Sequence, residues 1–82
     1  MKVTVFSTAT CGICHALMGW LDKKGVAYQK ILVDESNDNM TRLMEVSDGA
    51  IGVPFTLIEK DDGSKVTIAG FDQKKFEQTL AA

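Results

Sequence analysis

Two cysteines stand three residues apart, directly after an alternating apolar run, in the stretch KVTVFSTATCGIC of residues 2–14. The run from Lys2 to Ser7 alternates and is rich in Val and Phe, which predicts a β-strand. The segment from Cys11 to Lys24 repeats its apolar residues at helical spacing, and Thr10 is the expected N-cap of this helix. The sequence therefore places the cysteine pair at a strand-to-helix junction.

A cysteine at the start of a helix lies next to unpaired amide groups and the positive end of the helix dipole. Both favour the thiolate, so we expect the pKa of Cys11 to fall below the free value of about 8.5. Cys14 is one turn further along and nearer the core face of the helix. We therefore expect Cys11 to attack a substrate disulfide and Cys14 to resolve the mixed disulfide.

The remaining apolar patterns predict the other elements of the fold. They indicate a strand over Val26–Val33 and a helix over Asn39–Val46. Residues 51–54 then lead into a strand over Phe55–Glu59, which is followed by a strand over Lys65–Ala69 and a helix over Gln73–Leu80. Asp72 is the expected N-cap of the last helix, and Phe71 and Phe76 fit a hydrophobic staple. The chain is then one α/β domain, residues 1–82, in the order β-α-β-α-β-β-α, with a four-stranded mixed sheet and helices on both faces.

Charge and composition exclude several classes of function. The 82 residues carry a formal net charge of −2, and no run of Lys or Arg forms the basic stripe that nucleic acid or an anionic membrane requires. The longest apolar stretches are far shorter than a bilayer span, and the first residues do not resemble a signal peptide. Two cysteines are too few for a disulfide-stapled secreted domain. We therefore expect a cytoplasmic protein.

Other interpretations of the cysteine pair are open to test. The two thiols could be inert core residues, although a strand-to-helix junction favours redox chemistry. A zinc site needs about four ligands, and the chain offers two Cys and one His, so we expect no metal site within one chain. An iron–sulfur cluster shared by two chains, with Cys11 as a ligand, stays open. His15 could tune the thiols, but its place on the helix favours a solvent-facing side chain.

Three motifs in this order give a resemblance to a family. Residues 3–7 with 10–14, then Val53-Pro54, then residues 69–72 resemble the glutaredoxins, which have a thioredoxin-like fold, and show some likeness to the reductants of ribonucleotide reductase. The resemblance implies a cis peptide bond before Pro54. It also implies a set of residues that bind substrate or glutathione, namely Thr10, Gly12, Ile13, Val53, Pro54, Gly70, Phe71 and Asp72.

The chain also departs from the usual glutaredoxin pattern. Gly12 and Ile13 stand where Pro-Tyr is typical, Thr8 stands where a lysine is usual, and Gly52 replaces a threonine. The missing lysine removes a cation that would attract a glutathione carboxylate. The Gly70-Phe71 pair is found in the ribonucleotide-reductase reductants, which take electrons from thioredoxin reductase.

The predicted function is a dithiol–disulfide oxidoreductase that reduces protein disulfides or glutathione mixed disulfides. We expect a monomer with no tightly bound cofactor, with glutathione as a co-substrate and either glutathione or thioredoxin reductase as the electron source. Two other classes are an iron–sulfur carrier or sensor with Cys11 as ligand in a dimer, and a binding-only module that keeps the fold.

Overall fold

The computed structural model describes residues 1–50 and 52–81. Ile51, in the segment expected before the third strand, and Ala82, the last residue of the predicted domain, lie outside the described residues. The elements in chain order are β1 (Lys2–Ser7), α1 (Gly12–Lys23), β2 (Gln29–Leu32), α2 (Asn37–Val46), β3 (Phe55–Glu59), β4 (Lys65–Ala69) and α3 (Gln73–Ala81).

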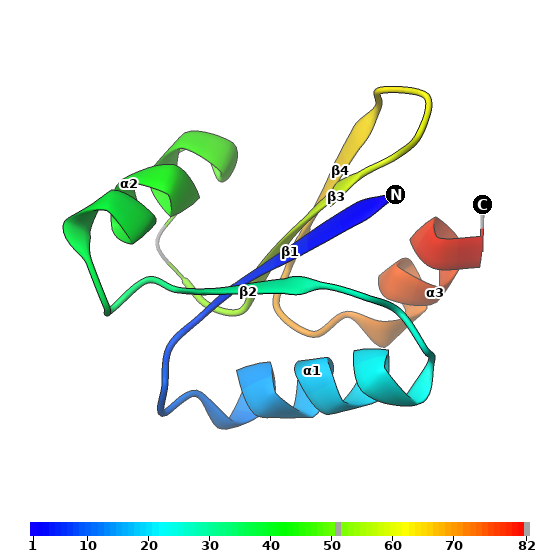
Figure 1. Cartoon of the computed structure of the whole chain (residues 1–82), viewed down its shortest axis with the longest axis horizontal. Coiled ribbons are helices and arrows are strands. Elements are labelled where there is room, and N and C mark those ends of the chain that lie inside the picture. Colours follow the sequence, from blue (N-terminus) through cyan, green and yellow to red (C-terminus); the bar gives the residue numbers. More distant parts are fainter. Residues whose placement is uncertain (51, 82) are drawn as a thin grey trace.

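The sheet has four strands in the order β2-β1-β3-β4. β1 pairs with β2 in parallel, while β3 is antiparallel to both β1 and β4. α1 and α3 cover one face of this sheet and α2 lies on the other (Figure 1). The predicted α/β fold, with a mixed sheet between helices, is therefore confirmed. None of the helices formed by the described residues combines the length and apolar character that crossing a bilayer needs.

Each face of the sheet has its own apolar core. On the face of α1 and α3, nine buried residues form the larger cluster: Val3, Val5, Cys14, Leu17, Met18, Leu21, Ile58, Ile68 and Phe76. On the face of α2, five form the smaller one: Phe6, Ile31, Val33, Leu43 and Phe55. Phe6 and Val5 are neighbours in β1 and enter different clusters, because successive side chains of a strand point to opposite faces.

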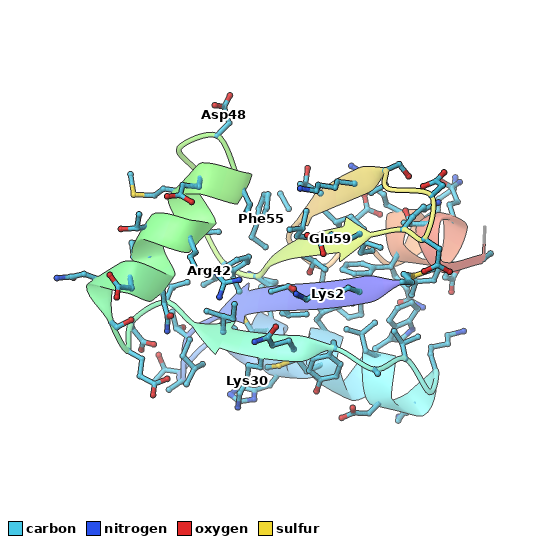
Figure 2. All side chains as sticks on the ribbon, turned by 45° about the horizontal axis from the view of Figure 1, so that its top comes forward. Lys2, Lys30, Arg42, Asp48, Phe55 and Glu59 are labelled. Carbon is cyan, nitrogen blue, oxygen red and sulfur yellow. A yellow bond between two sulfur atoms is a disulfide. The ribbon has the colours of Figure 1, made fainter. Side chains whose placement is uncertain are left out.

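α2 covers only one end of its face of the sheet. Phe55 lies beside α2, whereas Lys2 and Glu59 lie further along the strands, away from this helix (Figure 2). Lys2 and Glu59 are also direct cross-strand partners of opposite charge. The end that α2 covers is the end of β1 that leads to the cysteine loop.

The second strand is shorter than expected, Gln29–Leu32 in place of Val26–Val33. The N–H of Val26 donates to the carbonyl of Leu21 at 3.0 Å, so Val26 belongs to the end of α1. The apolar pattern extended the predicted strand to Val26, but a strand also needs a neighbour with which to pair.

α2 begins at Asn37, two residues earlier than expected, because Ser36 is its N-cap. The Ser36 hydroxyl accepts a hydrogen bond from the N–H of Asn39 at 3.1 Å. Replacing Ser36 by alanine is expected to cost about 1 kcal/mol of unfolding free energy, because that N–H loses its partner. Thermal unfolding of Ser36→Ala beside the exposed neighbour Glu35→Ala measures this. Equal melting temperatures for the two variants would contradict the capping role.

α3 starts as the sequence predicts. The Asp72 carboxylate accepts from the N–H of Lys75 at 3.2 Å, which is the N-cap bond. The rings of Phe71 and Phe76 meet edge to face with centroids 6.3 Å apart, as in a hydrophobic staple. Gly70 precedes this turn with φ of 74°, a backbone conformation that a residue with a Cβ rarely adopts.

Candidate active site: the Cys11–Cys14 pair

Cys11 is itself the N-cap of α1, and the prediction of Thr10 as the cap is wrong. The N–H of Cys11 donates to the carbonyl of Thr8 at 3.4 Å, which closes a turn and delays the helix to Gly12. The Cys11 sulfur accepts a hydrogen bond from the N–H of Cys14 at 3.1 Å. The sulfur thus occupies the position of a capping oxygen, where amide groups and the helix dipole stabilise a negative charge.

The two cysteines form a disulfide, so the structure shows the oxidised form of the pair. Their Cα atoms are 5.2 Å apart, within the range that a disulfide requires. Cys14 is 0% exposed and part of the larger core, whereas Cys11 is partly exposed. Of the two cysteines, Cys11 is therefore the one that reaches the surface.

The two residues between the cysteines, Gly12 and Ile13, are exposed. Ile13 is 60% exposed, a large fraction for a side chain of its size, and Gly12 is also exposed. An added Cβ at Gly12 would meet nothing within 4 Å, so the protein itself does not require glycine there. Gly12 and Ile13 therefore lie exposed directly after Cys11.

The Val53–Pro54 bond is cis, as the resemblance implies. Pro54 is buried, and its carbonyl accepts from the N–H of Gly70 at 2.8 Å, which ties the segment before β3 to the turn before α3. Val53 is partly buried and packs against both cores, including the one that contains Cys14. Among the described residues, the backbone of Val53 forms no hydrogen bond outside strands and helices.

The structure gives other predicted binding residues local roles. Phe71 packs edge to face on Trp20 of α1, with ring centroids 5.7 Å apart, so it helps to join α3 to α1. Asp72 is exposed and caps α3, as described above. Thr10 is exposed in the turn before Cys11. These positions leave Asp72 and Thr10 accessible to a ligand.

His15 is exposed, as the favoured interpretation predicted, but it also makes a contact that the sequence did not indicate. Its Nε2 atom lies 3.1 Å from the carbonyl oxygen of Ala9. This hydrogen bond links the first turn of α1 to the loop between β1 and α1, which ends at Cys11. His15 therefore supports the shape of the loop.

Sequence reasoning missed two buried hydroxyl groups on the face of the sheet that α1 and α3 cover. Ser7 and Thr56 are 0% exposed, and neither hydroxyl has a hydrogen-bond partner among the residues that the structure describes. The polar identity of these residues, inside strands, gave no sign of which face they would occupy. Only the strand register places them on the face of α1.

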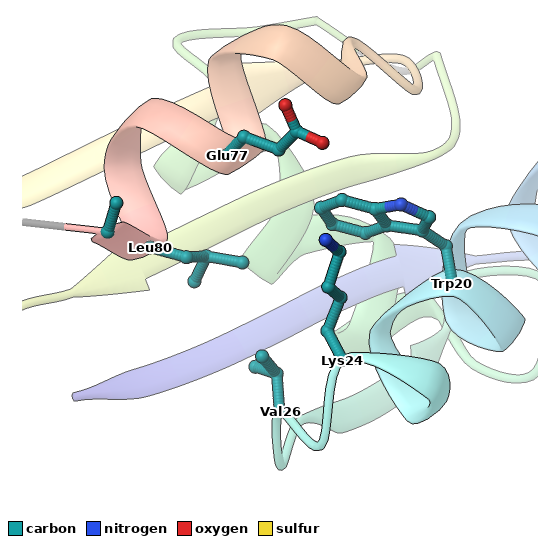
Figure 3. Close-up of a pocket in the computed structure, with 6 residues that line it drawn as sticks. Trp20, Lys24, Val26, Glu77 and Leu80 are labelled. Carbon is teal, nitrogen blue, oxygen red and sulfur yellow. The ribbon is translucent and has the colours of Figure 1, made fainter.

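Other features lie away from the cysteine pair. A pocket of about 420 Å³ opens between the C-terminal ends of α1 and α3, where the Lys24 ammonium stands 5.4 Å from the centre of the Trp20 ring (Figure 3). Burial and the nearby Asp22 carboxylate raise the pKa of Tyr28, which precedes β2. Within residues 1–50 and 52–81, no three Cys, His, Asp or Glu side chains gather as metal ligands would.

Comparison with known proteins agrees with this site. Residues 3–61 match the family model of the glutaredoxins. A mutant of the thioredoxin-like protein BC3987 is 28% identical with a TM-score of 0.80, over 96% of this chain and 99% of that one. The glutaredoxin of Methanosarcina mazei Go1 is 25% identical with a TM-score of 0.80, over 99% and 79% of the two chains.

The glutaredoxin-like NrdH-redoxin of Escherichia coli is 20% identical with a TM-score of 0.74, over 95% of this chain and 93% of that one, and its likeness shows the shared fold. No curated protein sequence matches the chain. The match of the family model covers most of the chain and includes both cysteines. With its thioredoxin-like fold and its cysteine pair at disulfide distance, this chain belongs to the glutaredoxin family.

Proposed function

We propose that this chain is a dithiol reductase of protein disulfides and of glutathione mixed disulfides. The observation that carries the proposal is the asymmetry of the pair: a partly exposed Cys11 at a helix N-cap, and a fully buried Cys14 one turn away. The thiolate is the nucleophile in disulfide exchange, so the stabilised and accessible sulfur attacks first.

The reaction proceeds in two exchanges. The Cys11 thiolate attacks one sulfur of the substrate disulfide, forming a mixed disulfide and releasing the other substrate sulfur as a thiolate, which takes up a proton. Cys14 then loses its proton and attacks the Cys11 sulfur, so that the Cys11–Cys14 bond forms and the second substrate thiolate leaves. The substrate gains two electrons and two protons, and the protein ends as the disulfide seen here.

The surroundings of Cys11 favour a peptide substrate. Ile13 offers an exposed apolar contact beside the sulfur, and the Val53 backbone can pair with an extended segment as an added strand. We propose that disulfide-containing proteins are the main substrates and that the chain works as a cytoplasmic monomer with no resident cofactor. The NrdH-redoxin of Escherichia coli, a glutaredoxin-like protein of the same fold, has a thioredoxin-like activity profile.

The electron source is tested by a recycling assay on the oxidised protein. One mixture contains NADPH, glutathione and glutathione reductase, and the other contains NADPH and thioredoxin reductase. We expect faster NADPH oxidation with thioredoxin reductase, because Thr8 stands where a lysine would attract glutathione's carboxylate. Faster turnover with glutathione would assign glutathione as the donor. Turnover with neither donor, from protein that holds the disulfide, would refute the reductase and favour the shared iron–sulfur cluster.

Substitutions at Asp72 distinguish a role in binding glutathione from a role as the N-cap of α3. Asp72→Asn keeps an oxygen that can accept from the N–H of Lys75 but removes the charge. If Asp72 binds the ammonium of glutathione's glutamyl end, this variant raises the KM for glutathione mixed disulfides about threefold to tenfold, as expected for a lost charged contact near the surface. Its melting temperature should change little.

Asp72→Ala is the matched comparison, because it loses both the charge and the cap. We expect the same rise in KM together with a melting temperature a few degrees lower. An unchanged KM in Asp72→Asn would show that Asp72 is a cap alone, without affecting the proposal for protein disulfides.

A further inference from the structure

Two buried hydroxyl groups lie on the same face of the sheet as Cys14. Thr56 of β3 is the direct partner of Val5 on β1, and cross-strand partners share a face. Ser7 is two residues after Val5, so it also shares that face. Val5 and Cys14 belong to the same core cluster. The hydroxyls of Ser7 and Thr56 therefore point into the layer between the sheet and the helices α1 and α3.

They also lie at the same end of this layer as Cys14. β1 runs toward the cysteine loop and ends at Ser7, and α1 then runs back over the sheet, as the connection between parallel β1 and β2 requires. Cys14 is in the first turn of α1, so it lies over the end of β1. Leu17, Met18 and Leu21 continue toward the other end of the strands.

An unpaired hydroxyl in a core is costly and calls for an explanation. Ser7, Thr56 and Cys14 are each 0% exposed, and the two hydroxyls have no hydrogen-bond partner among the described residues. Removing a hydroxyl from water without a compensating hydrogen bond is unfavourable. A sulfur in a disulfide is a weak acceptor, whereas a thiolate accepts strong, charge-assisted hydrogen bonds from O–H groups.

We propose that the Ser7 and Thr56 hydroxyls donate hydrogen bonds to the Cys14 sulfur when the disulfide is open and Cys14 is a thiolate. This inference rests on the proposed function, in which Cys14 must lose its proton before it attacks Cys11. Burial alone opposes that ionisation, because it disfavours the charged form. The two hydroxyls offset the cost of ionising the buried Cys14 when it attacks the mixed disulfide at Cys11. Their own protons stay on oxygen.

The surroundings of Cys14 leave few other groups for this role. The apolar residues that share its core cluster offer no hydrogen-bond donor: Val3, Val5, Leu17, Met18, Leu21, Ile58, Ile68 and Phe76. Cys11 is the titratable neighbour on α1, and His15 is exposed and bonded to the carbonyl of Ala9. Tyr28 is a partly buried member at the edge of the same cluster, before β2. Of the buried polar side chains in the described residues, Thr4 faces the other side of the sheet and the Thr79 hydroxyl already donates to the carbonyl of Lys75, which leaves those of Ser7 and Thr56.

The first test titrates Cys14 alone, in a Cys11→Ser background, through the ultraviolet absorbance of its thiolate. Thr56→Val removes the hydroxyl with little change in shape, and Thr56→Ser keeps it. We expect Thr56→Val to raise the midpoint by about one pH unit, a roughly tenfold loss of thiolate at a given pH. Thr56→Ser should titrate like the parent, and Ser7→Ala should shift the midpoint in the same direction as Thr56→Val.

The second test compares melting temperatures in the two redox states of the otherwise intact protein. In the oxidised form, Thr56→Val removes an unpaired buried hydroxyl and should raise the melting temperature by a few degrees. In the reduced form at alkaline pH, it removes a hydrogen bond to the Cys14 thiolate, so the gain should vanish or reverse. A role in packing alone would give the same change in both states.

The proposal is overturned if Thr56→Val and Ser7→Ala both titrate like the parent, or if Thr56→Val changes both redox states equally. Neither test uses a substrate or an electron donor. Failure of the recycling assay, with these shifts present, would refute the proposed reductase function and leave the hydrogen bonds to Cys14 standing.

Discussion

Replacing Cys11 by serine is expected to reduce disulfide reduction by a thousandfold or more, to the uncatalysed background. The only accessible sulfur of the pair is lost, and a serine hydroxyl is not ionised near neutral pH, so the covalent intermediate cannot form. The fold should survive, because a serine oxygen can accept the N–H of Cys14 that the Cys11 sulfur now accepts at 3.1 Å. Insulin reduction and turnover of a glutathione mixed disulfide measure the loss.

Cys14→Ser is the matched variant, since it keeps the nucleophile and removes the resolving thiol. With a protein disulfide, it should accumulate a mixed disulfide through Cys11, visible by mass spectrometry as a covalent adduct. With a glutathione mixed disulfide, a second glutathione thiol can replace Cys14 as the resolving group, so part of the turnover should remain. Equal activity of Cys11→Ser and the parent protein would rule out the proposed mechanism.

Replacing Phe76 by alanine is expected to lower the free energy of unfolding by about 3–5 kcal/mol, a large part of the roughly 5–15 kcal/mol of a typical domain. Phe76 is 0% exposed in the larger core. Its ring meets Trp20 edge to face at 6.0 Å and Phe71 at 6.3 Å, so it joins α3 to α1 and to the turn before α3. Truncation removes these contacts and leaves a cavity.

Urea unfolding of the oxidised protein measures this effect. Lys74→Ala is the control, because Lys74 is an exposed residue of the same helix. Lysine and alanine both favour helix formation, so this substitution tests only the loss of a surface side chain. Phe76→Leu should cost less than Phe76→Ala, because it fills more of the volume. A Phe76→Ala midpoint close to that of Lys74→Ala would show that α3 is not held by this aromatic contact.

Local patterns in the sequence were sufficient for most of the fold. The third and fourth strands and the start of the last helix lie where the sequence predicts, because each is bounded by its own turn or cap. The Asp72 cap and the Phe71–Phe76 contact are also confirmed, since both involve residues at most five positions apart. The errors fall at element boundaries: a strand partner is missing at Val26, a turn delays the helix at Thr10, and the Ser36 cap starts α2 early.

The sequence by itself determined the fold class and the place of the cysteine pair. Two cysteines three residues apart, after a strand and at a helix start, predict redox chemistry, and the structure places them at disulfide distance. The spacing also made Cys14 the more buried of the two, because it falls on the apolar stripe of α1.

Only the tertiary structure decided what surrounds that pair. The register of β1 on β3 sets Thr56 opposite Val5, and so brings the hydroxyls of Ser7 and Thr56, 49 positions apart in the chain, to the face beneath α1. The contact of Pro54 with Gly70 is equally long-range. Alternation within a strand tells which residues share a face, but not which face is covered or by what. The packing of the helices decides which face is covered. Burial of the apolar side chains covers the whole face, so polar groups on that face are buried with them.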